Sequence, residues 1–175
     1  MSCLLTSGRI LGCKSSQGGL KNVYFSDFGT LGTTTIVDGE ITAITGSPVF
    51  FKFDLKGSST LESTITSSRE NGTTFTTQAL NLTLPILDKA TQEQIKLLSV
   101  ARPHVVVEDY NANFFMVGLK NGTEVTSGTI VSGAAMGDMS GFTLSMEAME
   151  SDPAFFVTST VVTANESATQ IDPNA

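Results

Sequence analysis

The chain has 175 residues, enough for one domain with a substantial core, and 40% of them are hydrophobic while only 15% are charged. Its net charge of −7 argues against a protein that binds nucleic acid through phosphate contacts. No apolar run approaches the ~18 residues of a membrane helix. Threonine and serine stand where charged residues are usual, which favours β-strands and polar contacts between subunits.

Residues 1–32 are predicted to form a flexible or extended N-terminal arm, because six glycines interrupt any regular pattern. Within it, Leu20–Phe25 has the composition of a strand. No basic segment precedes an uninterrupted apolar core, so a signal peptide is not expected. Cys3 and Cys13 could close a small loop, but two reduced thiols are the expected state in a protein made in the cytosol.

Three pairs of residues predict tight β-hairpins: Asp38-Gly39, Asn71-Gly72 and Asn121-Gly122. A two-residue type I′ turn needs positive φ at both central residues, and these pairs adopt it at little steric cost. Each pair is flanked by residues typical of strands. We therefore expect three antiparallel hairpins.

The strand after Asn71-Gly72 is predicted to run from Thr73 to Leu84 and to end at Pro85. Apolar residues occupy odd positions early in this stretch and even positions later. The pattern therefore predicts a β-bulge near Ala79.

A single helix is predicted over residues 88–101, with a narrow apolar stripe that would lie on the sheet. Thr91 and Gln94 resemble a capping box, and Asp88 could equally cap an earlier start. Arg102-Pro103 would end the helix, because the residue before a proline avoids the α region.

Further strands are predicted at residues 104–109, 114–120 and 141–149. The apolar segment from Ala154 to Val162 is predicted to be a strand or an exchanging arm. The β domain would then span residues 33–162, followed by a flexible C-terminal tail at 163–175.

Histidine and cysteine supply no recognisable site. His104 is the only histidine, and with two cysteines it offers no metal-ligand spacing. A catalytic triad would need a nucleophile and a carboxylate whose proximity a sequence cannot give. We expect His104 to be a polar residue at a strand edge.

Carboxylate pairs at Glu108-Asp109 and at Glu147 with Glu150 have the residue type of a glycosidase site. Such enzymes also need a sugar-binding cleft, usually with aromatic residues, and this chain has no tryptophan and two tyrosines. Solvated strand edges are the expected role of these residues.

Two glycine-rich segments could be mistaken for ligand sites. Gly12–Gly19 superficially looks like a phosphate-binding loop, but its lysine does not follow the second glycine. Asp138, between a glycine and a methionine, is expected to cap a turn. We therefore predict no enzyme and no catalytic, cofactor or metal site.

Adjacent phenylalanines predict strands that are covered on both faces, because neighbouring residues in a strand point in opposite directions. The pairs are Phe50-Phe51, Phe114-Phe115 and Phe155-Phe156. One face would belong to the core. The other could be covered by a second sheet, by the helix or by another subunit.

From Lys52 to Asp152-Pro153 the order of elements resembles virion structural proteins of tailed phages. The likeness is greatest to the small tail-tube and connector-ring proteins of phages of Bacteroides-like hosts, including crAss-like phages. It is carried by the hairpin tip and by three later segments, namely Ser68–Gly72, Leu84–Asp88, Asp109–Phe115 and Met136–Leu144.

This resemblance implies a mainly β fold: an antiparallel β-sandwich or half-barrel with one flanking α-helix, tail-tube-like. Copies of the chain would assemble into rings or stacked rings, expected to be hexameric, in the virion tail after synthesis in the host cytoplasm. Other tail or neck proteins would be partners, DNA would pass only as cargo during ejection, and no membrane is involved. An acidic channel would repel DNA phosphates.

The residues expected to contact another subunit lie at the tip of the long hairpin and in the phenylalanine pairs. They are Arg69, Glu70, Asn71, Gly72, Phe50, Phe155 and Phe156. Two alternatives stay open. One is a capsid decoration or head-tail joining protein, and the other is an Ig-like adhesin or carbohydrate-binding module.

Overall fold

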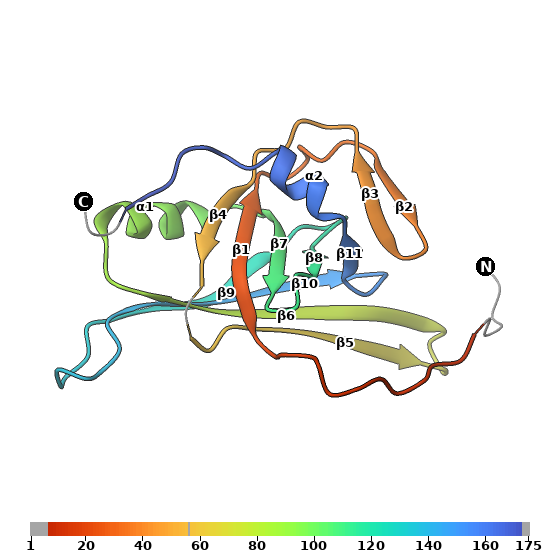
Figure 1. The fold of residues 1–175 in the computed structure, drawn as a ribbon, viewed down its shortest axis with the longest axis horizontal. Helices are drawn as coiled ribbons and strands as arrows, with labels where there is room; N and C mark the ends of the chain where they lie inside the picture. Colours follow the sequence, from red (N-terminus) through yellow and green to blue (C-terminus); the bar gives the residue numbers. More distant parts are fainter. Residues whose placement is uncertain (1–6, 56, 173–175) are drawn as a thin grey trace.

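The computed structural model describes residues 7–55 and 57–172, and the strands in them form two sheets packed face to face (Figure 1). The seven-stranded sheet has the order β2 (Thr34–Val37), β3 (Glu40–Ile44), β11 (Phe155–Val157), β8 (Phe114–Val117), β7 (His104–Asp109), β1 (Leu20–Ser26), β4 (Phe51–Asp54). The four-stranded sheet has the order β5 (Thr60–Ser68), β6 (Thr73–Pro85), β10 (Gly141–Glu150), β9 (Glu124–Val131).

The fold class predicted from the sequence is confirmed as a mainly β sandwich with a flanking helix, and the described strands do not close into a barrel. Neighbouring strands are antiparallel with one exception, β3 and β11, which run parallel. The helix α1 (Lys89–Leu98) lies on the same side of the four-stranded sheet as the seven-stranded sheet (Figure 1).

The main core lies between the two sheets, where alternate residues of each strand point inward. Its central members are fully or almost fully buried: Val23, Val105, Val107, Leu80, Leu82, Phe142, Leu144 and Met146. Ile95 and Leu98 of α1 pack against this core beside the seven-stranded sheet.

A second core covers the opposite face of the seven-stranded sheet. The helix α2 (Ser159–Ala164) contributes Val161 and Val162, which lie against Val106 and Met116. Because β7 is covered on both faces, its three consecutive valines are all fully buried. The chain itself therefore supplies the two-sided cover that the phenylalanine pair of β8 requires.

Two of the three predicted hairpins form. Asp38 and Gly39 both have positive φ, 51° and 84°, in the turn between β2 and β3. The β5–β6 hairpin also forms, but Ser68 pairs with Thr73, so its loop has four residues instead of two. The third prediction is wrong, because the loop containing Asn121-Gly122 crosses from β8 in one sheet to β9 in the other.

The helix begins as one of the two predicted alternatives. Asp88 is the N-cap, and its carboxylate accepts hydrogen bonds from the backbone N–H and the hydroxyl of Thr91. Three of its backbone contacts lower the pKa of this carboxyl, since they stabilise the charged form.

Three other expectations need correction. The arm was predicted to extend to residue 32, but β1 already lies inside the seven-stranded sheet between β7 and β4. The segment from Ala154 to Val162, predicted to be a strand or an exchanging arm, divides into β11 and the start of α2. The predicted bulge near Ala79 is absent, because β6 keeps a continuous register with β5 and β10.

Candidate assembly surfaces

The four-stranded sheet ends in two long edge strands, β5 and β9, each of which pairs on one side only within the described chain. Neither strand contains lysine, arginine or proline, the residues that commonly protect an edge. One bulge, at Thr126, interrupts β9. The two edges therefore offer rows of backbone N–H and C=O groups that another strand can complete.

The outer face of this sheet carries side chains in rows across the strands. One row holds Thr60, Asn81, Ser145 and Ser127, and the hydroxyl of Ser145 donates to the side-chain oxygen of Asn81 at 2.8 Å. Thr83, Thr143 and Thr129 form the next row, in which the hydroxyls of Thr129 and Thr143 contact each other.

A single row on this face is acidic. Glu62 of β5 lies opposite Ala79 of β6, which lies opposite Glu147 of β10, which lies opposite Glu124 of β9. Like charges directly opposite each other in a sheet are destabilising. The outer face therefore concentrates negative charge at one level, between rows of neutral hydroxyls.

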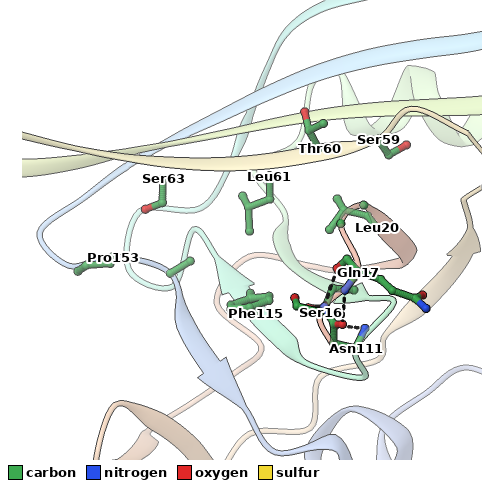
Figure 2. A pocket seen from close by; sticks show the side chains of 14 residues that line it. Ser16, Gln17, Leu20, Ser59, Thr60, Leu61, Ser63, Asn111, Phe115 and Pro153 are labelled. Atoms are coloured by element: carbon green, nitrogen blue, oxygen red, sulfur yellow. Dashed lines mark hydrogen bonds between the residues drawn. The ribbon is translucent and has the colours of Figure 1, made fainter. Parts of the chain in front are cut away.

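A cleft of about 490 Å³ opens between the inner face of β5 and the seven-stranded sheet. Figure 2 shows Leu61 and Ser63 on one wall, with Phe115 and Pro153 facing them. The start of β1 and the residues just before it close one end, at Leu20. The cleft is mostly apolar, which suits an apolar side chain from outside.

The N-terminal arm is tied down beside this cleft. The backbone N–H of Gln17 donates to the side-chain oxygen of Asn111, and the amide of Asn111 donates back to the carbonyl of Gln17. Asp109 shapes this turn by accepting hydrogen bonds from Asn111 and Asn113. Burial raises the pKa of the Asp109 carboxyl, but these hydrogen bonds outweigh burial and lower it.

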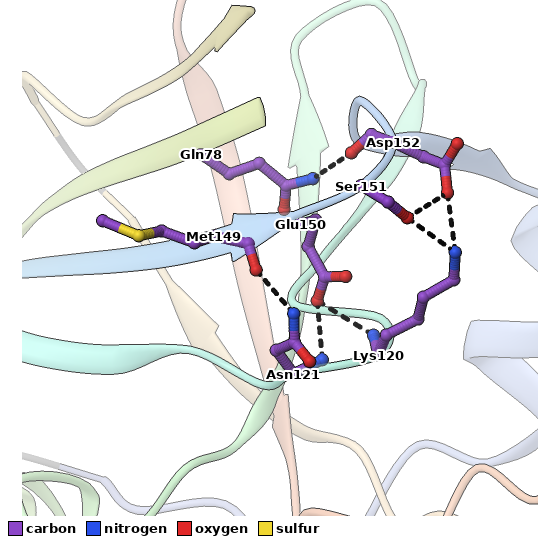
Figure 3. Close-up of polar contacts among 7 residues, drawn as sticks. All are labelled: Gln78, Lys120, Asn121, Met149, Glu150, Ser151 and Asp152. Atoms are coloured by element: carbon purple, nitrogen blue, oxygen red, sulfur yellow. Dashed lines mark hydrogen bonds and ion pairs between the residues drawn. The ribbon is translucent and has the colours of Figure 1, made fainter. Parts of the chain in front are cut away.

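A polar network joins the two sheets at the C-terminal end of β10 (Figure 3). The buried Glu150 carboxylate accepts from the backbone N–H groups of Lys120 and Asn121, at 2.9 and 2.8 Å. Gln78 accepts from the N–H of Gly118 and donates to the carbonyl of Asp152. The Asn121-Gly122 loop is therefore held by buried side chains and not by a hairpin ladder.

His104 serves the fold. Its Nδ1–H donates to the carbonyl of Gly118 at 2.7 Å, and its Nε2 accepts from the backbone N–H of Gly29 at 3.1 Å. Phe28 stacks on the ring, and the Arg102 guanidinium lies over Phe28. Burial lowers the pKa of His104 against the opposing effects of Gly118 and Glu150, so the neutral ring is favoured.

Glu108 is buried and accepts hydrogen bonds from Asn22, Lys21 and Tyr24. Burial raises the pKa of the Glu108 carboxyl, but these contacts outweigh burial and lower it. Burial and the adjacent Glu108 carboxylate raise the pKa of Tyr24.

Asp138 accepts hydrogen bonds from the backbone N–H groups of Ala134 and Ala135, as expected of a turn cap. In the described residues no group of three or more His, Cys, Asp or Glu side chains is arranged to hold a metal ion.

The predicted contact residues differ in how accessible they are. Arg69, Glu70, Asn71 and Gly72 are exposed at the hairpin tip. Phe50 is fully buried in the second core, and its backbone pairs with Asn165 and Ser167, so the proposal of Phe50 as a contact is not supported. Phe155 packs against that core, whereas Phe156 is 49% exposed and contacts Phe115.

Cys13 is free and exposed, and Cys3 lies outside the described residues. None of the described helices is long and apolar enough to span a bilayer.

No protein-family model, curated protein or solved structure matches this chain. The phage resemblance therefore stays a prediction.

Neither the acidic row nor the cleft is predictable from the sequence alone. The three glutamates come from strands up to 85 positions apart in the chain, and their alignment needs the register of every strand between them. The cleft needs the packing of the two sheets.

Proposed function

We propose that this chain is a self-assembling structural subunit of a tailed-phage virion, whose rings form the tail tube or a tail connector through which DNA passes. The observation that supports this most directly is the pair of long edge strands, β5 and β9, each of which pairs on one side only within the described residues. Such edges invite pairing with another chain.

The directions of these edge strands suit a ring. Successive neighbours from β5 to β9 are antiparallel, so β9 runs antiparallel to β5. If β9 of one copy lies beside β5 of the next, the antiparallel pattern continues from subunit to subunit. Such a head-to-tail contact closes into a ring when the rotation permits.

The charge of the outer face fits a passage for DNA. This face carries hydroxyl rows and the row of Glu62, Glu124 and Glu147. Lining a channel with these groups would place carboxylates around DNA phosphates, which repel one another. DNA would then move through without adhering.

The test is whether the purified chain forms rings by itself. We expect annuli or tubes in negative-stain images and a sedimentation coefficient above that of the 18.4 kDa monomer. A capsid decoration or head-tail joining protein would stay unassembled until a preformed shell was added. A lone monomer at high concentration, with or without shells, would contradict the proposal.

Ile130 provides the matched pair of variants. It is 58% exposed near the end of β9 and has the inward-facing position of that strand. A lysine that points inward from an edge strand blocks pairing with another chain. We expect Ile130→Lys to reduce ring formation and Ile130→Thr to keep it. Equal assembly of the two variants would remove β9 from the interface.

A further inference from the structure

The N-terminal arm presents two large apolar side chains to solvent. Ile10 is 93% exposed and Leu11 is 92% exposed, and every described residue from 7 to 19 is exposed. Burying one side chain of this kind is worth about 1.5–3 kcal/mol. An extended arm that holds both in water therefore gains considerably from a partner surface.

The arm and the body carry opposite charges. Residues 7–19 contain two positive charges, Arg9 and Lys14, and no acidic residue. The whole chain carries −7, so the rest of it carries −9. The Asp109 carboxylate lies in the lining of the β5 cleft. Electrostatic attraction therefore favours contact between the arm of one copy and the body of another.

The cleft beside β5 has the size and lining for such side chains. Its apolar walls include Leu61, Phe115 and Pro153, and its volume of about 490 Å³ is open in the structure (Figure 2). Gln17 is anchored at the mouth of this cleft, and the arm then leads away from it to the far end of the β5–β6 hairpin (Figure 1). The arm therefore does not have to turn back toward its own body in order to enter the cleft of another copy.

We propose that Ile10 and Leu11 of one copy fill the β5 cleft of a second copy, so that the arms link subunits. This inference builds on the self-assembly proposed above but uses different atoms. The ring contact uses the backbone edges of β5 and β9, whereas the arm contact uses side chains on the inner face of β5.

Disulfide cross-linking tests whether the arm of one copy contacts the cleft of another. In a background with Cys3 and Cys13 replaced by serine, Leu11→Cys is combined with Ser63→Cys, because Ser63 is exposed in the cleft. We expect oxidation to shift the chain from monomer to dimer and larger species on non-reducing gels. The matched control pairs Leu11→Cys with Thr64→Cys, whose side chain lies on the opposite face of β5, and little cross-linking is expected there.

The outcomes separate this inference from the proposed function. Rings with no Leu11–Ser63 cross-link, with a cross-link only within one chain, or with equal cross-linking at Thr64 would overturn the arm contact alone. A Ser63-specific ladder from Ile130→Lys protein that forms no rings supports the arm contact independently of ring closure. A chain that neither forms rings nor cross-links would overturn both.

Discussion

Glu147 and Glu150 lie three residues apart on β10 and face opposite sides of the four-stranded sheet. Glu147 is part of the acidic row on the outer face. Glu150 is buried and satisfies two backbone N–H groups of the β8–β9 loop. The same residue type therefore has a surface role and a structural role, and the difference comes entirely from the strand's alternation.

We predict that Glu150→Ala lowers the free energy of unfolding by about 2–3 kcal/mol, because it leaves two partly buried N–H groups without an acceptor. Glu147→Ala, the matched control, should change it by less than about 0.5 kcal/mol, as for most surface substitutions. Urea unfolding at neutral pH measures both. Equal effects would mean that the Glu150 contacts contribute nothing to stability.

Because His104 is buried as the neutral ring, we predict that the folded chain loses stability in mild acid. Its pKa in the folded chain lies below the ordinary value of 6.5, so between these two pH values the unfolded chain binds more protons. The contribution of the neutral ring is complete above about pH 6.5 and is lost as the pH falls through the folded-state pKa. Protonation also removes the lone pair that accepts from Gly29.

The measurement is urea unfolding at several pH values from 5 to 8. His104→Gln should be less stable at pH 8 and should lack the His104 part of the decline below pH 6.5. The same decline in His104→Gln as in the unaltered chain would place its origin in the carboxylates instead.

At the scale of the elements, local chemistry was predictable and pairing was not. The Asp38-Gly39 turn depends on its own two residues and was predicted correctly, and the cap at Asp88 is one of the two alternatives that the sequence left open. Asn121-Gly122 has the same turn chemistry as a hairpin. It forms a crossing between sheets because Glu150 and Gln78, distant in sequence, bind the neighbouring backbone. The bulge near Ala79 was predicted because the apolar residues of this strand shift from odd to even positions. The even positions face inward along the whole strand, since the polar side chains of Thr76 and Gln78 are buried as well.

The hairpin tip gives a prediction about one glycine. Gly72 has φ of +62° and no atom within 4 Å of the position a Cβ would occupy, so a side chain meets strain but no clash. Gly72→Val should destabilise the hairpin by about 1–2 kcal/mol, the cost of a left-handed conformation. If the tip contacts another copy, ring formation should also fall while the subunit stays folded.

Gly137→Val is the control, because Gly137 also has open space but no left-handed φ. Thermal unfolding and sedimentation of the two variants measure the difference. Unchanged assembly of Gly72→Val, despite its lower stability, would remove the tip residues from the subunit contact.

At the scale of the whole molecule, the buried polar side chains of the sandwich are hydrogen-bonded, whereas the two edge strands of the four-stranded sheet each have one unpaired side within the described chain. None of the buried side-chain nitrogen or oxygen atoms in the described residues lacks a hydrogen-bond partner. By contrast, β5 and β9 are open along 9 and 8 residues. Alternation and turn residues predicted antiparallel strands, and the sandwich was implied by the phage resemblance, but which strands form the edges depends on long-range order. The edges proposed to mediate assembly are for that reason the part of the fold that the sequence predicts least well.

If the chain forms the proposed ring, we predict that the acidic row makes ring formation depend on salt. In that ring β9 of each copy would lie beside β5 of the next, which would bring the rows of Glu62, Glu124 and Glu147 from all subunits onto one channel surface. Their mutual repulsion opposes closure, and salt screens it, since the Debye length falls from about 30 Å at 0.01 M to about 3 Å at 1 M. We therefore expect the ring fraction in sedimentation velocity to rise with ionic strength.

The triple variant with glutamine at Glu62, Glu124 and Glu147 should form rings equally well at about 0.01 M and about 1 M salt. It should also retain DNA more strongly. A matched triple variant with glutamine at Glu40, Glu93 and Glu166, which lie outside the four-stranded sheet and the hairpin tip, should keep the salt dependence of the unaltered chain. If the two triple variants respond to salt alike, the acidic face does not line a shared channel.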